Sequence, residues 1–385
     1  MYVQVVECFK FKRQVDEMVE ENSRAHLDEL FCRMPELGAS DLHLKSGNPP
    51  MFRIEGQLRR AKSNPLSSEQ IEKLVADWIG EKKVEKIHSE GSMDIGHEFE
   101  KGRVRVAVFL QRGRLSLVAR LVESEIPELE ELHLPPSLKK ATDYNEGLVL
   151  VCGITGAGKS TTLACLLDMM NRNKARHILT FEDPIEFIYE DRQSVINQRE
   201  YDLDSLNWAD AIRTGVRSDP DVMLIGEMRD QETFQLCLTA AETGHLVLST
   251  MHTSSAAGTV GRILDLFPPE RHKLLRQSLA FNLKAIICQR LVPSFREEIG
   301  RVPAVEVMWV NAPIRKAIEE GEEGKIGELI REGEEEEMQS WTKSFVDLIN
   351  ADLVEKKVAR EYAPNKDALE MAIKGISFSS SSRSS

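Results

Sequence analysis

The chain has 385 residues, of which 41% are hydrophobic and 29% are charged, and its formal net charge is −13. This length predicts more than one domain, and no stretch approaches the apolar length of a membrane-spanning helix. The acidic balance disfavours a protein that wraps nucleic-acid backbone, because neutralising phosphates requires concentrated Lys and Arg.

The N-terminus lacks the apolar core and the small-residue cleavage site of a signal peptide, so a cytoplasmic protein is expected. The six cysteines form no CxxC pair, which argues against a zinc knuckle and against a thioredoxin-like site. Most of them are expected to be reduced, buried thiols.

In chain order, residues 1–38 are predicted to form a helical extension that ends in a turn between Pro35 and Gly38. Residues 39–122 contain alternating or β-rich segments and one helical segment that starts at serines, which together predict a small α+β domain. Residues 123–146 are rich in Pro and charge and are predicted to be a linker with one short helix.

Residues 147–350 begin with short apolar strands that alternate with helical stretches, a pattern typical of a parallel sheet covered by helices. After about residue 263 the chain is predicted to be mostly helical, with an exposed acidic helix and loop over residues 319–337. Residues 351–385 form a C-terminal segment whose serine-rich end is expected to be disordered.

The segment GITGAGKS fits the phosphate-loop pattern GxxxxGK[ST] completely, and it follows a predicted strand and precedes a predicted helix. Its glycines allow backbone N–H groups to point into the loop, where the start of the helix adds positive potential. Lys159 is predicted to reach the β- and γ-phosphates, and Ser160 to offer its hydroxyl to Mg²⁺. The predicted nucleotide-binding residues are Gly153, Thr155, Gly156, Ala157, Gly158, Lys159, Ser160 and Thr161.

Three further segments carry candidate catalytic groups. Glu227 follows the apolar strand segment VMLI, and an acid at that point of a parallel sheet lies beside the phosphate loop, although a plain surface acid is the alternative. The acids of TFEDPIEF include Glu186, and such a cluster serves a cation or a water, or is a solvated turn. His245 and His252 flank the segment LVLSTM, and each is either functional or structural.

The ordered set GITGAGKSTTLA, TFEDPIEF, DPDVMLIGEMRDQET and AAETGHLVLSTMHTSSA resembles the secretion-type ATPases, in particular the PilT/PilU pilus-retraction motors. In that family these segments are the Walker A, Asp-box, Walker B and His-box motifs. The segment ASDLHLKSGNPPMFRIEGQLRR is similar to the start of the family's PAS-like domain. The resemblance implies an α/β chain with a RecA-like ATPase domain, preceded by a PAS-like domain and followed by helices.

The resemblance implies roles for single residues. Glu186 orients the attacking water, Glu227 serves Mg²⁺, and His252 senses the γ-phosphate, although the two glutamates are free to exchange roles. His245 is a further candidate contact to the nucleotide. Arginines stabilise the transferring phosphoryl group in such motors. The candidates are Arg105 and Arg120, with Arg103 and Arg112 as alternatives, whereas Arg217 and Arg229 are intersubunit or structural.

The resemblance further implies a hexameric ring on the cytoplasmic side of the inner membrane. Such a ring turns a platform protein at the pilus base and retracts the pilus. A paralogous retraction ATPase is a second candidate partner, and nucleic acid is not expected. The sequence contains no tetracysteine zinc site, which favours retraction over the assembly and type II secretion relatives. The competing functions are a PilU-like accessory, an assembly or secretion ATPase, and a nucleic-acid translocase.

Overall fold

The computed structural model describes residues 23–122, 125–201, 204–205 and 207–374, so most of the predicted N-terminal extension and the serine-rich tail lie outside the described residues. The chain divides into two compact units, Met1–Glu125 and Ile126–Ser385. Within the described residues, no helix has the length and apolar character needed to cross a membrane.

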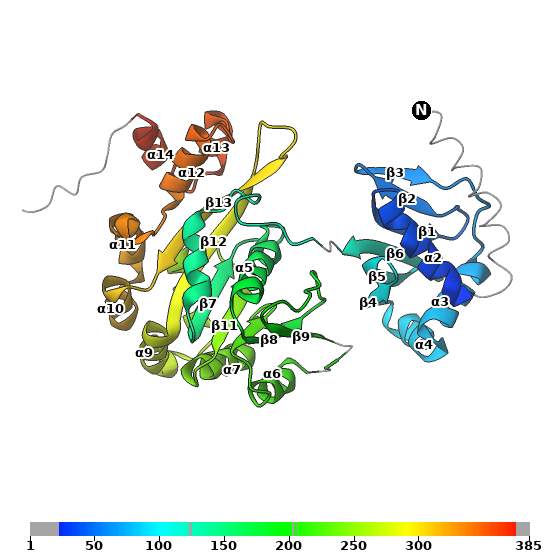
Figure 1. Cartoon of the computed structure of the whole chain (residues 1–385), viewed down its shortest axis with the longest axis horizontal. Coiled ribbons are helices and arrows are strands. Elements are labelled where there is room, and N and C mark those ends of the chain that lie inside the picture. The colour runs from blue at the N-terminus through cyan, green and yellow to red at the C-terminus, as the bar shows by residue number, and fades with distance from the viewer. Residues whose placement is uncertain (1–22, 123–124, 202–203, 206, 375–385) are drawn as a thin grey trace, which may run out of the picture. The chain divides into compact units, whose positions relative to one another are not determined.

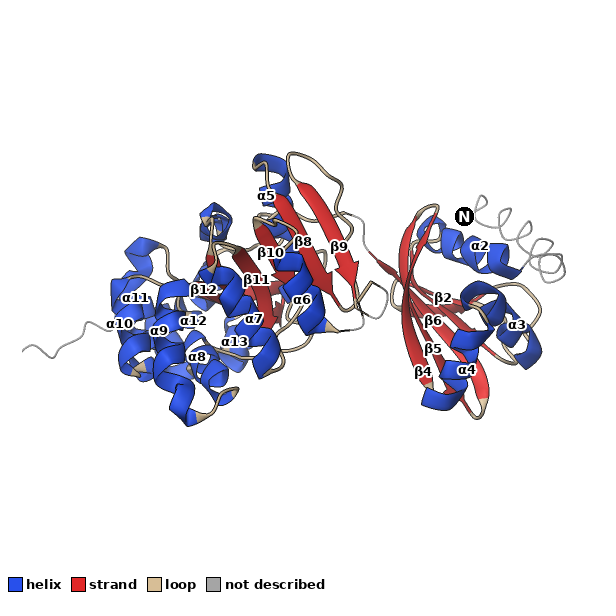
Figure 2. Ribbon diagram, turned by 90° about the horizontal axis from the view of Figure 1, so that it is seen from below, coloured by secondary structure: helices blue, strands red, loops and turns tan. Residues whose placement is uncertain are grey.

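In its described residues, the first unit is an antiparallel six-stranded sheet in the order β3-β2-β1-β6-β5-β4 with the helices α2, α3 and α4 on one face (Figure 2). Its core includes Leu27, Phe31 and Met34, which are fully buried, so the helix that contains them belongs to this unit. The elements are α2 (Ser23–Glu36), β1 (Ala39–Lys45), β2 (Met51–Ile54), β3 (Gln57–Arg60), α3 (Ser68–Ile79), α4 (Glu81–Glu90), β4 (Ser92–Phe99), β5 (Gly102–Gln111) and β6 (Arg114–Val122).

The second unit is a seven-stranded sheet in the order β13-β12-β7-β11-β10-β8-β9 (Figure 1). All neighbouring pairs are parallel except β12 and β13. The strands are β7 (Gly147–Cys152), β8 (His177–Glu182), β9 (Val195–Glu200), β10 (Val222–Ile225), β11 (Leu246–Met251), β12 (Leu283–Pro293) and β13 (Arg301–Trp309). The α-helices are α5 (Lys159–Asn173), α6 (Trp208–Val216), α7 (Gln231–Glu242), α8 (Ala256–Asp265), α9 (His272–Asn282), α10 (Ala312–Glu320), α11 (Ile326–Glu332), α12 (Trp341–Asn350), α13 (Lys356–Tyr362) and α14 (Lys366–Ile373). The 3₁₀ helices are η1 (Pro136–Asp143), η2 (Pro269–Arg271), η3 (Glu323–Lys325) and η4 (Gly333–Glu336).

The three central strands β7, β10 and β11 are buried over their whole length, because helices cover both faces of a parallel sheet. This explains why their sequences are continuous apolar runs. The predicted fold class is confirmed: an antiparallel-sheet domain precedes a mainly parallel-sheet domain that is followed by helices.

Two features differ from the sequence-based expectation. The predicted linker contributes Leu129, Leu134 and Leu138 to the core of the second unit, and Leu138 lies in the 3₁₀ helix η1. The described part of the region after residue 263 is mostly helical, as predicted, but β12 and β13 form an antiparallel pair of long strands within it that the sequence did not indicate. Both are near-continuous apolar runs, and such runs do not distinguish a buried strand from a buried helix by periodicity.

Candidate functional site

The phosphate loop joins β7 to α5, and its conformation requires glycine at several positions. Gly153, Gly156 and Gly158 have φ angles of +155°, +76° and +84°. A Cβ on Gly153 would lie 2.4 Å from the carbonyl oxygen of Gln289, and one on Gly158 would lie 2.8 Å from Nε2 of the same residue. The loop therefore depends both on left-handed backbone and on close approach to β12.

Gln289 is a residue of the site that the sequence did not indicate. Its Nε2 donates to the Ala157 carbonyl at 2.7 Å, and its Oε1 accepts from the Thr162 hydroxyl at 2.7 Å. Gln289 is 5% exposed, and its side chain connects the phosphate loop and the first turn of α5 to the neighbouring strand. No sequence signal marks this role, because Gln289 lies more than a hundred residues from the loop.

Lys159, the first residue of α5, folds back over the loop. Its Nζ donates to the carbonyl oxygens of Gly153 at 2.9 Å and of Ile154 at 3.2 Å. Burial lowers the pKa of this ammonium, while the charges of Glu227 and Glu186 act in the opposite direction. Both predicted catalytic carboxylates are therefore within electrostatic range of the phosphate-loop lysine.

Glu227 lies two residues beyond β10, at the same edge of the sheet as the phosphate loop. Its carboxylate contacts Nε2 of His252 at 3.4 Å and forms an ion pair with Arg229. His252 follows β11, whose last residue Met251 is in register with Cys152 at the end of β7. The structure thus brings Glu227 and His252 together beside the loop, and it adds Arg229 to them.

Glu186 lies on the loop that follows β8, and its side chain is exposed. The neighbouring Glu182 is buried, and burial raises the pKa of its carboxyl to about 7, although hydrogen bonds from Thr180 and Gln198 oppose this shift. The Thr180 hydroxyl donates to Glu182 Oε1 at 2.7 Å. Glu182 therefore has a structural environment, whereas Glu186 presents its carboxylate outward.

His245 does not join this group. It precedes β11, and Leu246 is in register with Gly147 at the beginning of β7. The six residues of β11 separate His245 from the loop edge by about 20 Å at the usual rise per residue. Its Nδ1 lies 3.0 Å from the Ala240 carbonyl oxygen, which is a structural contact at the opposite edge of the sheet.

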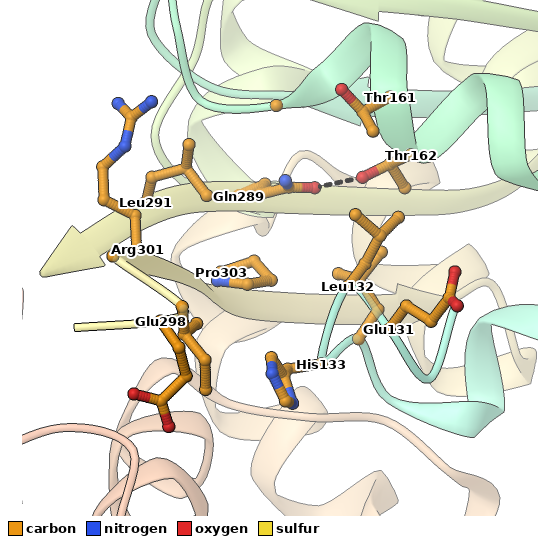
Figure 3. Close-up of a pocket in the computed structure, with 14 residues that line it drawn as sticks. Glu131, Leu132, His133, Thr161, Thr162, Gln289, Leu291, Glu298, Arg301 and Pro303 are labelled. Atoms are coloured by element: carbon orange, nitrogen blue, oxygen red, sulfur yellow. Dashed lines mark hydrogen bonds between the residues drawn. The ribbon is translucent and has the colours of Figure 1, made fainter. Parts of the chain in front are cut away.

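A cavity of about 590 Å³ opens beside the first turn of α5 (Figure 3). Thr161 and Thr162 line it from the helix, and Leu291 and Pro303 line it from β12 and β13. Glu131, His133 and Arg301 add polar groups to its wall. This cavity extends the site from the loop towards the β12–β13 pair.

Within the phosphate loop, Thr155 is exposed, Ser160 is partly exposed and Ala157 is buried.

The two predicted arginines belong to the first unit. Arg120 Nε donates to Asp41 Oδ1 at 2.8 Å, and Arg53 Nε lies 3.3 Å from Oδ2 of the same carboxylate. Asp41 is 3% exposed, whereas the Arg120 side chain is 72% exposed. Arg105 pairs loosely with Asp94 at 3.6 Å. Asp41 therefore fixes the Nε edge of Arg120 and leaves its terminal fork towards solvent.

A magnesium ion that accompanies a nucleotide needs few ligands from the protein. Within the described residues, no cluster of three or more His, Cys, Asp or Glu side chains is arranged to hold a metal ion. Mg²⁺ commonly takes only one or two protein oxygens and completes its shell with waters and substrate phosphates. The Ser160 hydroxyl and the Glu227 carboxylate are oxygen donors of this kind.

Comparison with known proteins decides the family. A family model described as "Type II/IV secretion system protein" matches residues 16–327. The chain belongs to this family. It is 40% identical to the type IV pilus retraction ATPase PilT of Pseudomonas aeruginosa over 338 residues, which cover 88% of the chain and 98% of the relative. It is 35% identical to the type IV pilus ATPase PilU of the same organism, over 90% of the chain and 91% of the relative.

A solved structure supports the same relationship. The crystal structure of the pilus retraction motor PilT with bound ADP matches with a TM-score of 0.82 and 38% identity, covering 89% of this chain and 98% of that one. The prediction of an ATPase of this family is confirmed, and the chain is homologous to the PilT retraction ATPase.

Proposed function

We propose that this chain hydrolyses ATP to power the retraction of type IV pili, as a homohexameric ring at the cytoplasmic face of the inner membrane. The observation that carries the proposal is the 40% identity to PilT over 98% of that protein's length. The assembly of the phosphate loop, Glu227 and His252 at one sheet edge supports nucleotide hydrolysis as the source of energy.

In the proposed mechanism the phosphates of ATP lie on the backbone N–H groups of the loop, and the Lys159 ammonium turns from the Gly153 and Ile154 carbonyls to the β- and γ-phosphates. Ser160 and Glu227 would hold magnesium, which when bound would supply positive charge against the phosphates. The base and ribose extend into the cavity beside Thr161. Gln289 supports the loop from β12 through its hydrogen bond to the Ala157 carbonyl.

Glu186 is proposed to orient the water that attacks the γ-phosphate, because its carboxylate is exposed and within electrostatic range of Lys159. His252 is proposed to sense the γ-phosphate, since its Nε2 lies 3.4 Å from the Glu227 carboxylate and its strand ends beside the phosphate loop. Arg105 and Arg120 are proposed to stabilise the transferring phosphoryl group. His245 retains no role in this mechanism, because it lies at the opposite sheet edge.

The proposed partners are an inner-membrane platform protein of the pilus and a paralogous retraction ATPase. The second candidate function is a PilU-like accessory, which the 35% identity to PilU favours. Hydrolysis by the purified chain separates the two. The proposal expects a Mg²⁺-dependent ATPase that Glu227→Gln abolishes. A near-zero hydrolysis rate in both the wild-type chain and Glu227→Gln would favour the accessory function.

An assembly or secretion ATPase and a nucleic-acid translocase are distinguished by separate tests. Deletion of the gene is expected to increase the number of surface pili and to abolish twitching, whereas loss of pili would identify an assembly or secretion ATPase. A nucleic-acid translocase would be stimulated by DNA. The proposal predicts the same hydrolysis rate with and without added DNA, in agreement with the net charge of −13.

A further inference from the structure

The edge strand β9 runs parallel to β8 and lies against the loop that carries Glu186. In the register of the two strands, Gln198 pairs with Thr180 and Glu200 pairs with Glu182. The loop leaves β8 after Glu182 and passes back over the carboxyl end of β9. Side chains on that end of β9 therefore face the backbone of residues 183–189.

Two side chains of β9 form hydrogen bonds with backbone groups on both sides of Glu186. Glu200 Oε2 accepts from the Ile185 N–H at 3.0 Å. Gln198 Nε2 donates to the Phe187 carbonyl at 2.8 Å, and its Oε1 accepts from the Tyr189 N–H at 3.0 Å. The same Nε2 lies 3.2 Å from Oε1 of the buried Glu182.

These contacts fix the backbone rather than the carboxylate. The side chain of Glu186 is exposed, whereas the residues before and after it, Ile185 and Phe187, are buried. The position of an exposed carboxylate depends mainly on the position of its own backbone. A displacement of about 1 Å at a reacting group lowers the rate on the order of 100-fold. The hydrogen bonds to β9 hold that backbone immediately on either side.

We propose that Gln198 and Glu200 are positioning residues for the Glu186 carboxylate, so that the edge strand sets the rate of hydrolysis without touching the nucleotide. The inference rests on the proposed role of Glu186 in orienting water. It predicts that loss of the Gln198 amide lowers kcat and leaves nucleotide affinity nearly unchanged. The reason is that β10 and β11 separate β8 from β7, which leads into the phosphate loop, and Gln289 lies farther away in β12.

The test is a double-mutant cycle in the full chain. Gln198→Leu is expected to lower kcat about tenfold while KM for ATP and the Kd for ADP change less than about twofold. In a Glu186→Gln background, the same substitution is expected to have no further effect on the single-turnover rate. Asn197→Leu is the matched control, since Asn197 Oδ1 instead contacts Nε2 of His177 at 2.9 Å. It is expected to keep wild-type kcat.

The outcomes separate the two claims. If Glu186→Gln retains wild-type kcat, the proposed role of Glu186 is wrong and the inference falls with it. If Glu186→Gln is impaired but Gln198→Leu lowers the rate by the same factor in both backgrounds, only the inference is overturned. Gln198→Met keeps an unbranched side chain and loses the hydrogen bonds to Phe187 and Tyr189 without adding a charge beside the buried Glu182, so it serves as a second variant if the leucine variant does not fold. It is expected to reduce kcat in the same selective way.

Discussion

Gln289→Leu is the substitution that most directly probes how the phosphate loop is held. Leucine fills most of the space of the Gln289 side chain but leaves the Thr162 hydroxyl and the Ala157 carbonyl without a hydrogen-bond partner. In the wild type, each of these groups lies 2.7 Å from the Gln289 amide. Each buried polar group without a hydrogen bond costs about 1–3 kcal/mol, so for the two groups we expect the free energy of unfolding to fall by about 2–6 kcal/mol. The Kd for ADP is expected to rise at least about tenfold.

A second substitution tests the reason for that loss. Thr162→Val in the Gln289→Leu background removes one of the two unpartnered groups, and it is expected to recover about 1 kcal/mol or more. Urea unfolding of the full chain, followed by tryptophan fluorescence, measures both changes. Gln277→Leu on the exposed surface of α9 is the matched control. Wild-type stability and ADP affinity in Gln289→Leu would refute the reasoning.

Three further predictions follow from single residues. Gly153→Ala is expected to abolish nucleotide binding, measured by calorimetry, because its Cβ would lie 2.4 Å from the Gln289 carbonyl oxygen; unchanged binding would contradict the loop geometry. Asp41→Asn is expected to lower the hydrolysis rate and the free energy of unfolding. Hydrogen bonds from Ser40 and Arg120 outweigh burial and hold the pKa of the Asp41 carboxyl below its usual value. The wild type should therefore lose the stabilisation that Asp41 provides as pH falls below about 4. Burial raises the pKa of Glu306 to about 7, so the folded state binds an extra proton between about pH 4.5 and 7. As pH rises over that range, the free energy of unfolding of the wild type should fall by up to about 3 kcal/mol relative to Glu306→Gln. Parallel pH profiles of the two proteins in urea unfolding would contradict this.

Local patterns predicted the parts of the site that are contiguous in sequence. The phosphate loop has fixed spacing, and Glu227 and His252 each follow an apolar strand, so the rule that ligands bind at the carboxyl ends of parallel strands brings them together. The same rule argues against His245, because it precedes its strand instead of following it. That signal was present in the sequence.

Other parts of the site depend on contacts between distant segments. Gln289 acts through Ala157 and Thr162, and Gln198 acts through the loop after β8, so neither forms a local motif. Their strands were also hard to identify. β12 is an apolar run without a clear period, and β9 is short and polar, with only Glu200 buried. Strand pairing, which the sequence does not show directly, creates both roles.

The proposed function requires that this chain pulls pili back by hydrolysing ATP. Retraction of fluorescently labelled pili on living cells tests it most directly, in a deletion strain that carries either the wild-type gene or Glu227→Gln. We expect pili to extend in both strains but to retract only with the wild-type protein. Normal retraction with Glu227→Gln, or the absence of pili in the deletion strain, would contradict it.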